Sequence, residues 1–143
     1  MTTNPDSILW RYRPWFFAQA FYNLIWGAVN ILFPRFYFDL IGMPPPNYPA
    51  LWQVVGMFVL VYVPAYWWAA RAPYKHRHLV LIAALGKVLG PIGFAWAALT
   101  GQLPIAFGLT LLTNDLIWWP ALALYLYDVS RLCGGVRALF VGD

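Results

Sequence analysis

The chain has 143 residues, of which 62% are hydrophobic and only 10% charged, and its formal net charge is +4. A soluble domain carries about 25% charged residues, and a domain this short cannot bury so much apolar surface in one core. The hydrophobic side chains are therefore expected to face lipid. The positive charges flank the apolar runs and form no patch, which argues against nucleic acid as a partner.

Four apolar segments are long enough to cross a bilayer, whose ~30 Å hydrocarbon core takes about 20 helical residues. They cover residues 15–33, 50–70, 79–99 and 105–127. The first exceeds the roughly 7–15 apolar residues of a signal peptide, so we expect it to remain in the membrane. The sequence therefore predicts an all-α fold, a polytopic integral membrane four-helix bundle, with residues 1–143 forming a single transmembrane domain.

Two shorter segments lie outside these helices. Residues 35–42 are aromatic and amphipathic, which is typical of a short helix on the membrane surface. Pro44, Pro45 and Pro46 follow and cannot form a helix interior, so the chain is expected to turn there. Residues 128–143 form the predicted C-terminal cytoplasmic tail.

The basic residues predict the orientation of the helices. One side of the membrane would carry seven of them: Arg11, Arg13, Arg71, Lys75, Arg77, Arg131 and Arg137. The other side carries only Arg35, and Lys87 lies within a predicted helix. Because loops rich in Lys and Arg stay in the cytoplasm, both termini are predicted to be cytoplasmic in a multi-pass protein of the inner (plasma) membrane.

Aromatic residues are abundant, with nine tryptophans and nine tyrosines. Many lie near the ends of the predicted helices, where amphipathic rings prefer the membrane interfaces. Most of the tryptophans are therefore assigned to interfacial anchoring. A pocket that binds a ring is the alternative.

Four polar residues inside the predicted helices are expected to meet at one level of the bundle: Asn23, Lys87, Asn114 and Asp115. Lys87 and Asp115 are the only base and the only acid within the predicted spans. At about 1.5 Å per residue, Asn23 and Lys87 lie roughly 12 Å from the cytoplasmic ends of their helices, and Asp115 roughly 18 Å. Polar groups are costly in hydrocarbon, so they usually face the bundle interior.

Two further patterns concern the contacts between helices. A second, smaller polar level is predicted to pair Asn30 with Gln53. Gly86, Gly90 and Gly93 share one face of the third helix, and the first two form a GxxxG pair. Because such residues let backbones approach closely, this face is predicted to pack against a neighbouring helix of the same bundle.

Two prolines lie beside the polar cluster. Pro91 has no N–H to donate to the carbonyl of Lys87, and Pro120 has none for that of Leu116. Each proline is expected to kink its helix. Each freed carbonyl must be satisfied by a side chain, water or a ligand, and the Lys87 ammonium is one candidate donor.

The polar cluster has two interpretations. In the structural one, Lys87 and Asp115 pair and the amides fix the helix register, since losing one partner of a buried pair costs about 3–5 kcal/mol. In the functional one, the intramembrane charges bind the head group of a lipophilic molecule or relay a proton.

No cofactor and no metal site is predicted. The one cysteine, Cys133, has no partner for an internal disulfide. His76 and His78 lie in a basic loop with no nearby carboxylate or thiolate that would complete a metal site. No catalytic residue is assigned, because no motif of a hydrolase, phosphate loop or cysteine cluster is present. Catalysis is left open but not favoured.

Four short stretches carry a resemblance: LGKVLGPIGF at 85–94, FGLTLLTNDLIWW at 107–119, YNLIWG from Tyr22 and PPPNYP from Pro44. With them the chain resembles a group of small uncharacterised bacterial membrane proteins. In its four spans, cytoplasmic termini and Gly-rich third helix it also loosely resembles the DoxX-like superfamily. That resemblance implies a bacterial inner-membrane bundle, and some members act in redox or thiol stress as partners of other proteins. Small multidrug transporters also have four spans, but they use a glutamate and this chain has none.

Two functions follow from these patterns. The favoured one is a non-catalytic accessory subunit or homo-oligomeric membrane component, whose polar cluster is structural. The alternative is a binding protein, carrier or enzyme for a lipophilic molecule, such as a quinone, an isoprenoid or an acyl lipid. Membrane lipids surround the chain in both, and the further partner is a membrane protein in the first and a lipophilic ligand in the second.

Overall fold

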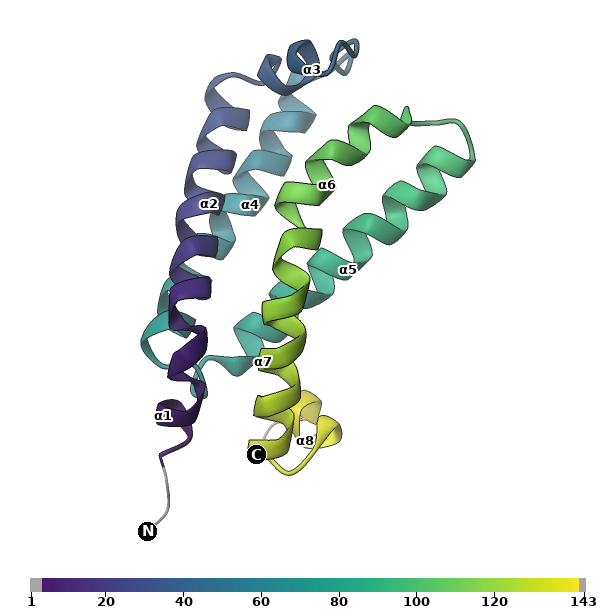
Figure 1. The fold of residues 1–143 in the computed structure, drawn as a ribbon. Helices are drawn as coiled ribbons and strands as arrows, with labels where there is room; N and C mark the ends of the chain where they lie inside the picture. The colour runs from purple at the N-terminus through teal and green to yellow at the C-terminus, as the bar shows by residue number, and fades with distance from the viewer. Residues whose placement is uncertain (1–3, 142–143) are drawn as a thin grey trace.

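The computed structural model describes residues 4–141, and this part of the chain is all-helical, without a strand (Figure 1). Four long segments follow one another: α2 (Arg13–Leu32), α4 (Pro49–Arg71), α5 (Arg77–Leu99), and a run made of the 3₁₀ turn η2 (Ile105–Gly108), α6 (Leu109–Asn114), the 3₁₀ turn η3 (Leu116–Trp118) and α7 (Trp119–Leu132). The short elements are α1 (Pro5–Leu9), the 3₁₀ turn η1 (Trp10–Tyr12), α3 (Phe36–Leu40) and α8 (Val136–Val141). The ends of α2, α4 and α5 lie within two residues of the ends predicted from the sequence.

Three segments are long and apolar enough to cross a membrane: α4, α5 and the 28-residue run Ile105–Leu132. They indicate a membrane protein. α2 has 20 residues, which is a spanning length, but it is not among the three. Gln19, Asn23 and Asn30 make it more polar, and all three side chains are buried. The amides of α2 are thus hidden inside the molecule.

The fourth predicted helix, residues 105–127, is not continuous. α6 ends at Asn114 and α7 begins at Trp119, and between them Asp115 leaves the helical conformation with φ −123° and ψ −62°. Pro120 accounts for a disturbance next to this break, since it lacks an N–H and its ring clashes with the carbonyl of Leu116. The single kinked helix predicted from the sequence is therefore corrected to α6 and the 14-residue α7 joined by a 3₁₀ turn, within a 28-residue run that keeps a spanning length.

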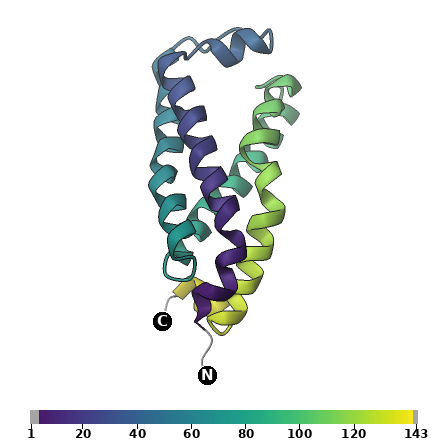
Figure 2. The ribbon, with the colours of Figure 1, turned by 60° about the vertical axis from the view of Figure 1, so that its left-hand side comes forward.

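The segments outside the long helices take defined places. α3 falls within the predicted surface helix 35–42 and lies across the end of the molecule opposite the termini, reaching toward α6 (Figures 1 and 2). The proline run 44–46 that follows is not helical. In the predicted tail, 128–143, α7 continues to Leu132 and α8 follows, while residues 142–143 lie outside the described part of the chain.

α2 and α4 form an antiparallel pair with the most extensive contacts in the molecule. Gly27 and Gly56 permit this approach, because a Cβ on either residue would lie 2.9 Å from the carbonyl oxygen of the other. α5 and the α6–α7 run meet the pair near the two termini and separate from it toward α3 (Figures 1 and 2). We call these two parts of the molecule the terminal half and the α3 half.

The buried core lies in the terminal half. Its centre is Tyr125, whose ring lies 5.0 Å from that of Phe16 and 5.5 Å from that of Tyr12. The Tyr125 hydroxyl donates a hydrogen bond to the carbonyl of Pro73, at 2.6 Å, in the loop before α5. The side chain of Tyr125 in α7 thereby packs on η1 and α2 and is hydrogen-bonded to the α4–α5 loop.

Polar contacts reinforce the same end. The carboxylate of Asp128 accepts hydrogen bonds from Arg11 and from the Tyr12 hydroxyl, which links α7 to η1. Burial, together with this bond, raises the pKa of the Tyr12 phenol, so the hydroxyl stays protonated as a donor. The guanidinium of Arg13 donates to the carbonyl of Ala70 at 2.7 Å and links α2 to α4. The terminal half is therefore held by both rings and hydrogen bonds.

Candidate functional site

The structure brings Lys87, Asn114 and Asp115 into direct contact where α6 ends against α5. Lys87 Nζ lies 3.8 Å from Asp115 Oδ1 and donates a hydrogen bond to the main-chain carbonyl of Asn114. The amide of Asn114 donates to Asp115 Oδ1 at 3.2 Å. Lys87 and Asp115 are only 7% and 5% exposed. The two opposite charges are thus buried side by side.

Two tryptophans satisfy carbonyls that the irregular helices leave free. In α5, Pro91 cannot donate to the carbonyl of Lys87, and the indole N–H of Trp119 occupies that carbonyl at 3.0 Å. In the broken fourth segment, the indole of Trp118 donates to the carbonyl of Thr113, also at 3.0 Å. The freed carbonyl of Lys87 is therefore satisfied by a tryptophan side chain, and the Lys87 ammonium, the candidate donor named from the sequence, bonds to the carbonyl of Asn114 instead.

Asn23 reaches the same place from α2 but forms no hydrogen bond with the other three residues. Together they line a cavity of about 150 Å³ between α2, α4, α5 and the break after α6. Three buried oxygens in this wall lack a hydrogen-bond partner among the described residues: Asn23 Oδ1, Asn114 Oδ1 and the hydroxyl of Tyr66. We call this space the polar cavity.

The second predicted level does not form the expected pair. Asn30 donates to the carbonyl of Trp26 at 2.6 Å and accepts from the indole of Trp52 at 2.5 Å. Gln53 donates to the carbonyl of Ile31 at 2.7 Å. The prediction that Asn30 bonds to Gln53 is wrong because nearer groups occupy both amides. Trp52 and Gln53 instead each tie α4 to α2.

The glycines of α5 do not make the contact predicted for them. A Cβ on Gly86 would meet only the hydroxyl of Tyr62, at 3.8 Å, and one on Gly93 would meet nothing within 4 Å. A Cβ on Gly90 would meet only the carboxylate of Asp115, at 3.5 Å from Oδ2. The prediction that another helix backbone packs here is therefore corrected, since α5 diverges from its neighbours. The close backbone contact belongs to α2 and α4.

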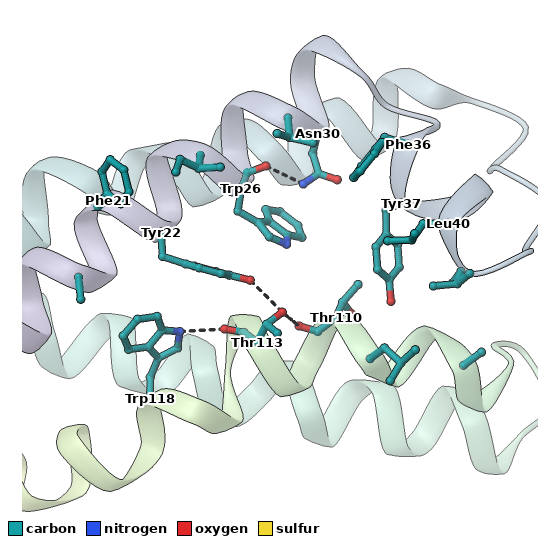
Figure 3. Close-up of a pocket in the computed structure, with 16 residues that line it drawn as sticks. Phe21, Tyr22, Trp26, Asn30, Phe36, Tyr37, Leu40, Thr110, Thr113 and Trp118 are labelled. Carbon is teal, nitrogen blue, oxygen red and sulfur yellow. Dashed lines mark hydrogen bonds between the residues drawn. The ribbon is translucent and has the colours of Figure 1, made fainter.

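A larger cavity of about 820 Å³ lies between α2, α3 and the η2–α6 segment (Figure 3). Its wall is rich in rings: Phe21, Tyr22, Trp26, Phe36, Tyr37 and Trp118. We call this space the aromatic cavity. It lies in the α3 half, where α2 and α6 stand apart, and it shares no lining residue with the polar cavity.

Most polar groups in the aromatic cavity are already bonded within the protein. The hydroxyl of Tyr22 donates to Thr113 Oγ1 at 2.9 Å and bridges α2 to α6 (Figure 3). The hydroxyl of Thr110 donates to the carbonyl of Phe107 at 2.9 Å. The indole nitrogen of Trp26 points toward the α6 side and donates no hydrogen bond within residues 4–141 (Figure 3). Trp26 therefore offers the cavity an unused donor.

The charge of the aromatic cavity restricts what it can hold. No Lys, Arg, His, Asp or Glu is among its 16 lining residues, all of which are described. A charged group in such a place would have no counter-charge and would lose its water. The arrangement suits an uncharged, mostly apolar molecule with one hydrogen-bond acceptor.

Sequence reasoning did not locate the aromatic cavity. It assigned most tryptophans to the membrane interfaces and left a ring-binding pocket as an alternative without assigning residues to it, and the structure places Trp26 and Trp118 in the wall of this cavity. A signal was present, because Tyr22 and Trp26 are four residues apart on one helix face and Thr110 and Thr113 are three apart on another. The spacing within each helix does not show how far apart the two helices lie, and it is their separation that leaves space between these faces.

Within residues 4–141, no three His, Cys, Asp or Glu side chains gather in a way that would hold a metal ion. Comparison of the chain with family models, with curated proteins and with solved structures finds no match. The two cavities are the features on which a function can be argued.

Proposed function

We propose that this protein binds a neutral lipophilic molecule in the aromatic cavity. The observation that carries the proposal is a space of about 820 Å³ with an aromatic wall and no charged side chain. Small-molecule pockets typically measure about 300–1,000 Å³ and combine apolar walls with a few polar groups. A quinone, an isoprenoid or a neutral acyl lipid has the matching chemistry.

The polar groups of the cavity support a ligand with one acceptor. Trp26 supplies an indole N–H, while the hydroxyl protons of Tyr22 and Thr110 are engaged in the protein. A carbonyl or ether oxygen on the ligand would accept from Trp26 while its apolar part packs on the rings. The sequence favoured a non-catalytic accessory subunit or homo-oligomeric component, and the cavity is the observation that leads us to propose ligand binding instead.

The proposal includes a topology of four spans with both termini in the cytoplasm, in the inner (plasma) membrane. α2 would be the fourth span, since its 20 residues measure about 30 Å. The seven basic residues near the termini and the α4–α5 loop, against one on the other side, support this orientation. An impermeant thiol reagent should label Gln102→Cys in a Cys133→Ser background from outside cells, and Cys133 only after permeabilisation.

Ligand binding is tested with the purified protein in lipid nanodiscs. A short-chain ubiquinone and an isoprenoid alcohol are expected to bind saturably, and oleate at neutral pH to bind at least tenfold more weakly. Ala106→Trp fills the aromatic cavity from η2 and should abolish binding, while Ala95→Trp places the same ring on the exposed surface of α5 and should not. Trp26→Phe keeps a ring but removes the donor, which should weaken binding about tenfold, or 1.4 kcal/mol.

Equal binding of oleate and the neutral probes would contradict the proposal, because the cavity would then not select against charge. So would a folded Ala106→Trp protein that binds the quinone as the wild type does. The fold of each variant is checked by circular dichroism and by size-exclusion chromatography in the same nanodiscs.

A further inference from the structure

The polar cavity differs from the aromatic cavity in its size, its charged and polar groups, and its lining residues. Four helical segments contribute to it, with Asn23 from α2, Tyr66 from α4, Lys87 from α5 and Asp115 from the break after α6. It is small, about 150 Å³, and most of its polar groups come from side chains. It shares no residue with the cavity assigned above to the lipophilic ligand.

Buried polar side chains with unused bonding capacity line this space. Asn23 is 3% exposed and Tyr66 is 1% exposed, yet neither Asn23 Oδ1 nor the Tyr66 hydroxyl has a partner within the described chain. Asn114 Oδ1 is also buried and has no hydrogen-bond partner among the described residues. Buried polar groups are nearly always hydrogen-bonded, so three unused oxygens around one cavity point to a polar occupant.

The charges of the cavity indicate what kind of polar group fits. Lys87 and Asp115 lie 3.8 Å apart and neutralise each other, so an added ion would have no counter-charge. An amide and a phenol can each donate and accept. A hydroxyl does both as well, and a volume of about 150 Å³ exceeds by several times the ~30 Å³ share of one water molecule. A small group with two or more hydroxyls matches the charge, the bonding and the size.

α5 leaves an approach to this cavity open. Gly86 lines it, and both Gly86 and Gly90 are exposed on the surface of α5. A Cβ on Gly90 would already touch Asp115 Oδ2 at 3.5 Å, so a larger side chain there would cover the carboxylate. Neither Gly90 nor Gly93 lines the cavity itself, but a side chain at Gly90 would contact Asp115, which does, whereas one at Gly93 would meet nothing within 4 Å. The absence of side chains at Gly86 and Gly90 therefore gives access to the polar groups.

We propose that the polar cavity is a second binding site, which takes a neutral group bearing two or more hydroxyls that enters over the glycine face of α5. Two sources share this chemistry: a free polyol, and the glycerol head group of a neutral lipid held beside α5 in the membrane. The site is independent of the lipophilic ligand proposed for the aromatic cavity.

The test uses the full chain in phosphatidylcholine nanodiscs and radiolabelled monooctanoylglycerol, which carries two hydroxyls. Saturable binding is expected, and methyl octanoate, which has the chain without the hydroxyls, should not compete. Competition by glycerol would assign the site to a free polyol, and its absence, with monooctanoylglycerol bound, would assign the site to a lipid head group. Either result supports a hydroxyl site.

Variants locate the binding. Gly90→Leu should weaken it at least tenfold, whereas Gly93→Leu, the same change on open surface, should leave it within twofold. Tyr66→Phe removes a hydroxyl that has no partner in the described chain, so the fold should tolerate it, while binding should weaken about tenfold. This second variant keeps the test decisive if Gly90→Leu does not fold.

Competition by methyl octanoate, or unchanged binding in a folded Tyr66→Phe protein, would overturn the proposal. Ubiquinone binding is measured in the same samples and should be unaffected by Gly90→Leu. In the wild-type protein, absence of saturable ubiquinone binding with monooctanoylglycerol bound would count against the aromatic cavity alone, and absence of saturable monooctanoylglycerol binding with ubiquinone bound would count against the polar cavity alone.

Discussion

In the terminal half the ring of Phe16 packs 5.0 Å from that of Tyr125, while in the α3 half α2 and α6 stand far enough apart to enclose about 820 Å³. The first region is joined by hydrogen bonds between segments distant in the chain, such as Arg13 to Ala70. The second is bridged across its cavity by two hydrogen bonds, from Tyr22 to Thr113 and from Tyr37 to the carbonyl of Phe107.

The contrast teaches how a small bundle can be stable and still contain space. Helices in lipid are not pressed together by the hydrophobic effect, so packing and polar contacts must hold them. Here the buried core lies at one end, and at the other end a smaller group of rings, in which the ring of Phe107 lies 5.8 Å from that of Trp52 and 6.0 Å from that of Tyr37, joins η2 to α4 and α3. The other end can therefore keep an opening between helices without loss of the fold, and Lys87 and Asp115 lie where the two regions meet.

The largest effect is expected at that junction. Lys87→Met should lower the free energy of unfolding by about 3–5 kcal/mol, because Asp115 would remain buried without its partner. The double variant Lys87→Met/Asp115→Leu should recover most of this loss. Unfolding in mixed detergent micelles measures both, with Lys75→Met in the exposed loop as the control. If Lys87→Met behaves like the control, the pair does not join the two halves.

A large-to-small change in each half compares their packing directly. Phe16→Ala should cost on the order of 2 kcal/mol, less than the 3–5 of soluble cores because no apolar surface moves into water on unfolding within the membrane. Phe36→Ala, at a ring 56% exposed in the α3 half, should cost less than about 0.5 kcal/mol. Similar losses in the same unfolding assay would show that the terminal half is not the better packed.

The glycines distinguish the α2–α4 pair, whose backbones stay in close contact, from α5, which diverges from its neighbours. Gly56→Ala should destabilise by about 1–3 kcal/mol, since its Cβ would lie 2.9 Å from the carbonyl oxygen of Gly27. Gly93→Ala meets nothing and should be neutral or slightly stabilising. Thermal denaturation of the two variants distinguishes them, and a stable Gly56→Ala protein would contradict the close approach of α2 and α4.

The smallest effect concerns the bridge across the aromatic cavity. Tyr22→Phe removes the hydrogen bond to Thr113 and should cost about 0.6 kcal/mol, the average for such bonds in membranes. Tyr48→Phe, at an exposed position, is the matched control and should cost nothing measurable. A loss of several kcal/mol in Tyr22→Phe would mean that this single bond, and not the terminal half, holds α2 to α6.

Part of this architecture follows from the sequence alone. Apolar length locates α4 and α5 because about 20 apolar residues have few other stable environments. Helical spacing and depth predicted that Asn23, Lys87 and Asp115 meet, since residues on inward faces at one level lie close together. All three line the polar cavity.

Other features depend on how helices diverge, which spacing within one helix does not contain. The exposed position of Gly93 and the space between Tyr22 and Thr110 both result from the separation of whole segments. Pro120 marked a disturbance in the fourth helix, but the departure of Asp115 from helical geometry depends on its surroundings. The sequence therefore indicated which residues face the interior, but it did not contain the distances between the segments.

The bond between Lys87 and the carbonyl of Asn114 also has a consequence for biosynthesis. Asn114 follows Lys87 by 27 residues, so Lys87 emerges from the ribosome before Asn114 and Asp115, the two groups that will hold its ammonium. A lysine at the centre of a helix opposes insertion by about 2.5–3.5 kcal/mol. α5 must enter the bilayer on its apolar content alone, and its mean hydropathy of 1.8 is the highest of the three apolar spans. Excess apolarity in α5 thus carries the lysine into the membrane in advance of its partners.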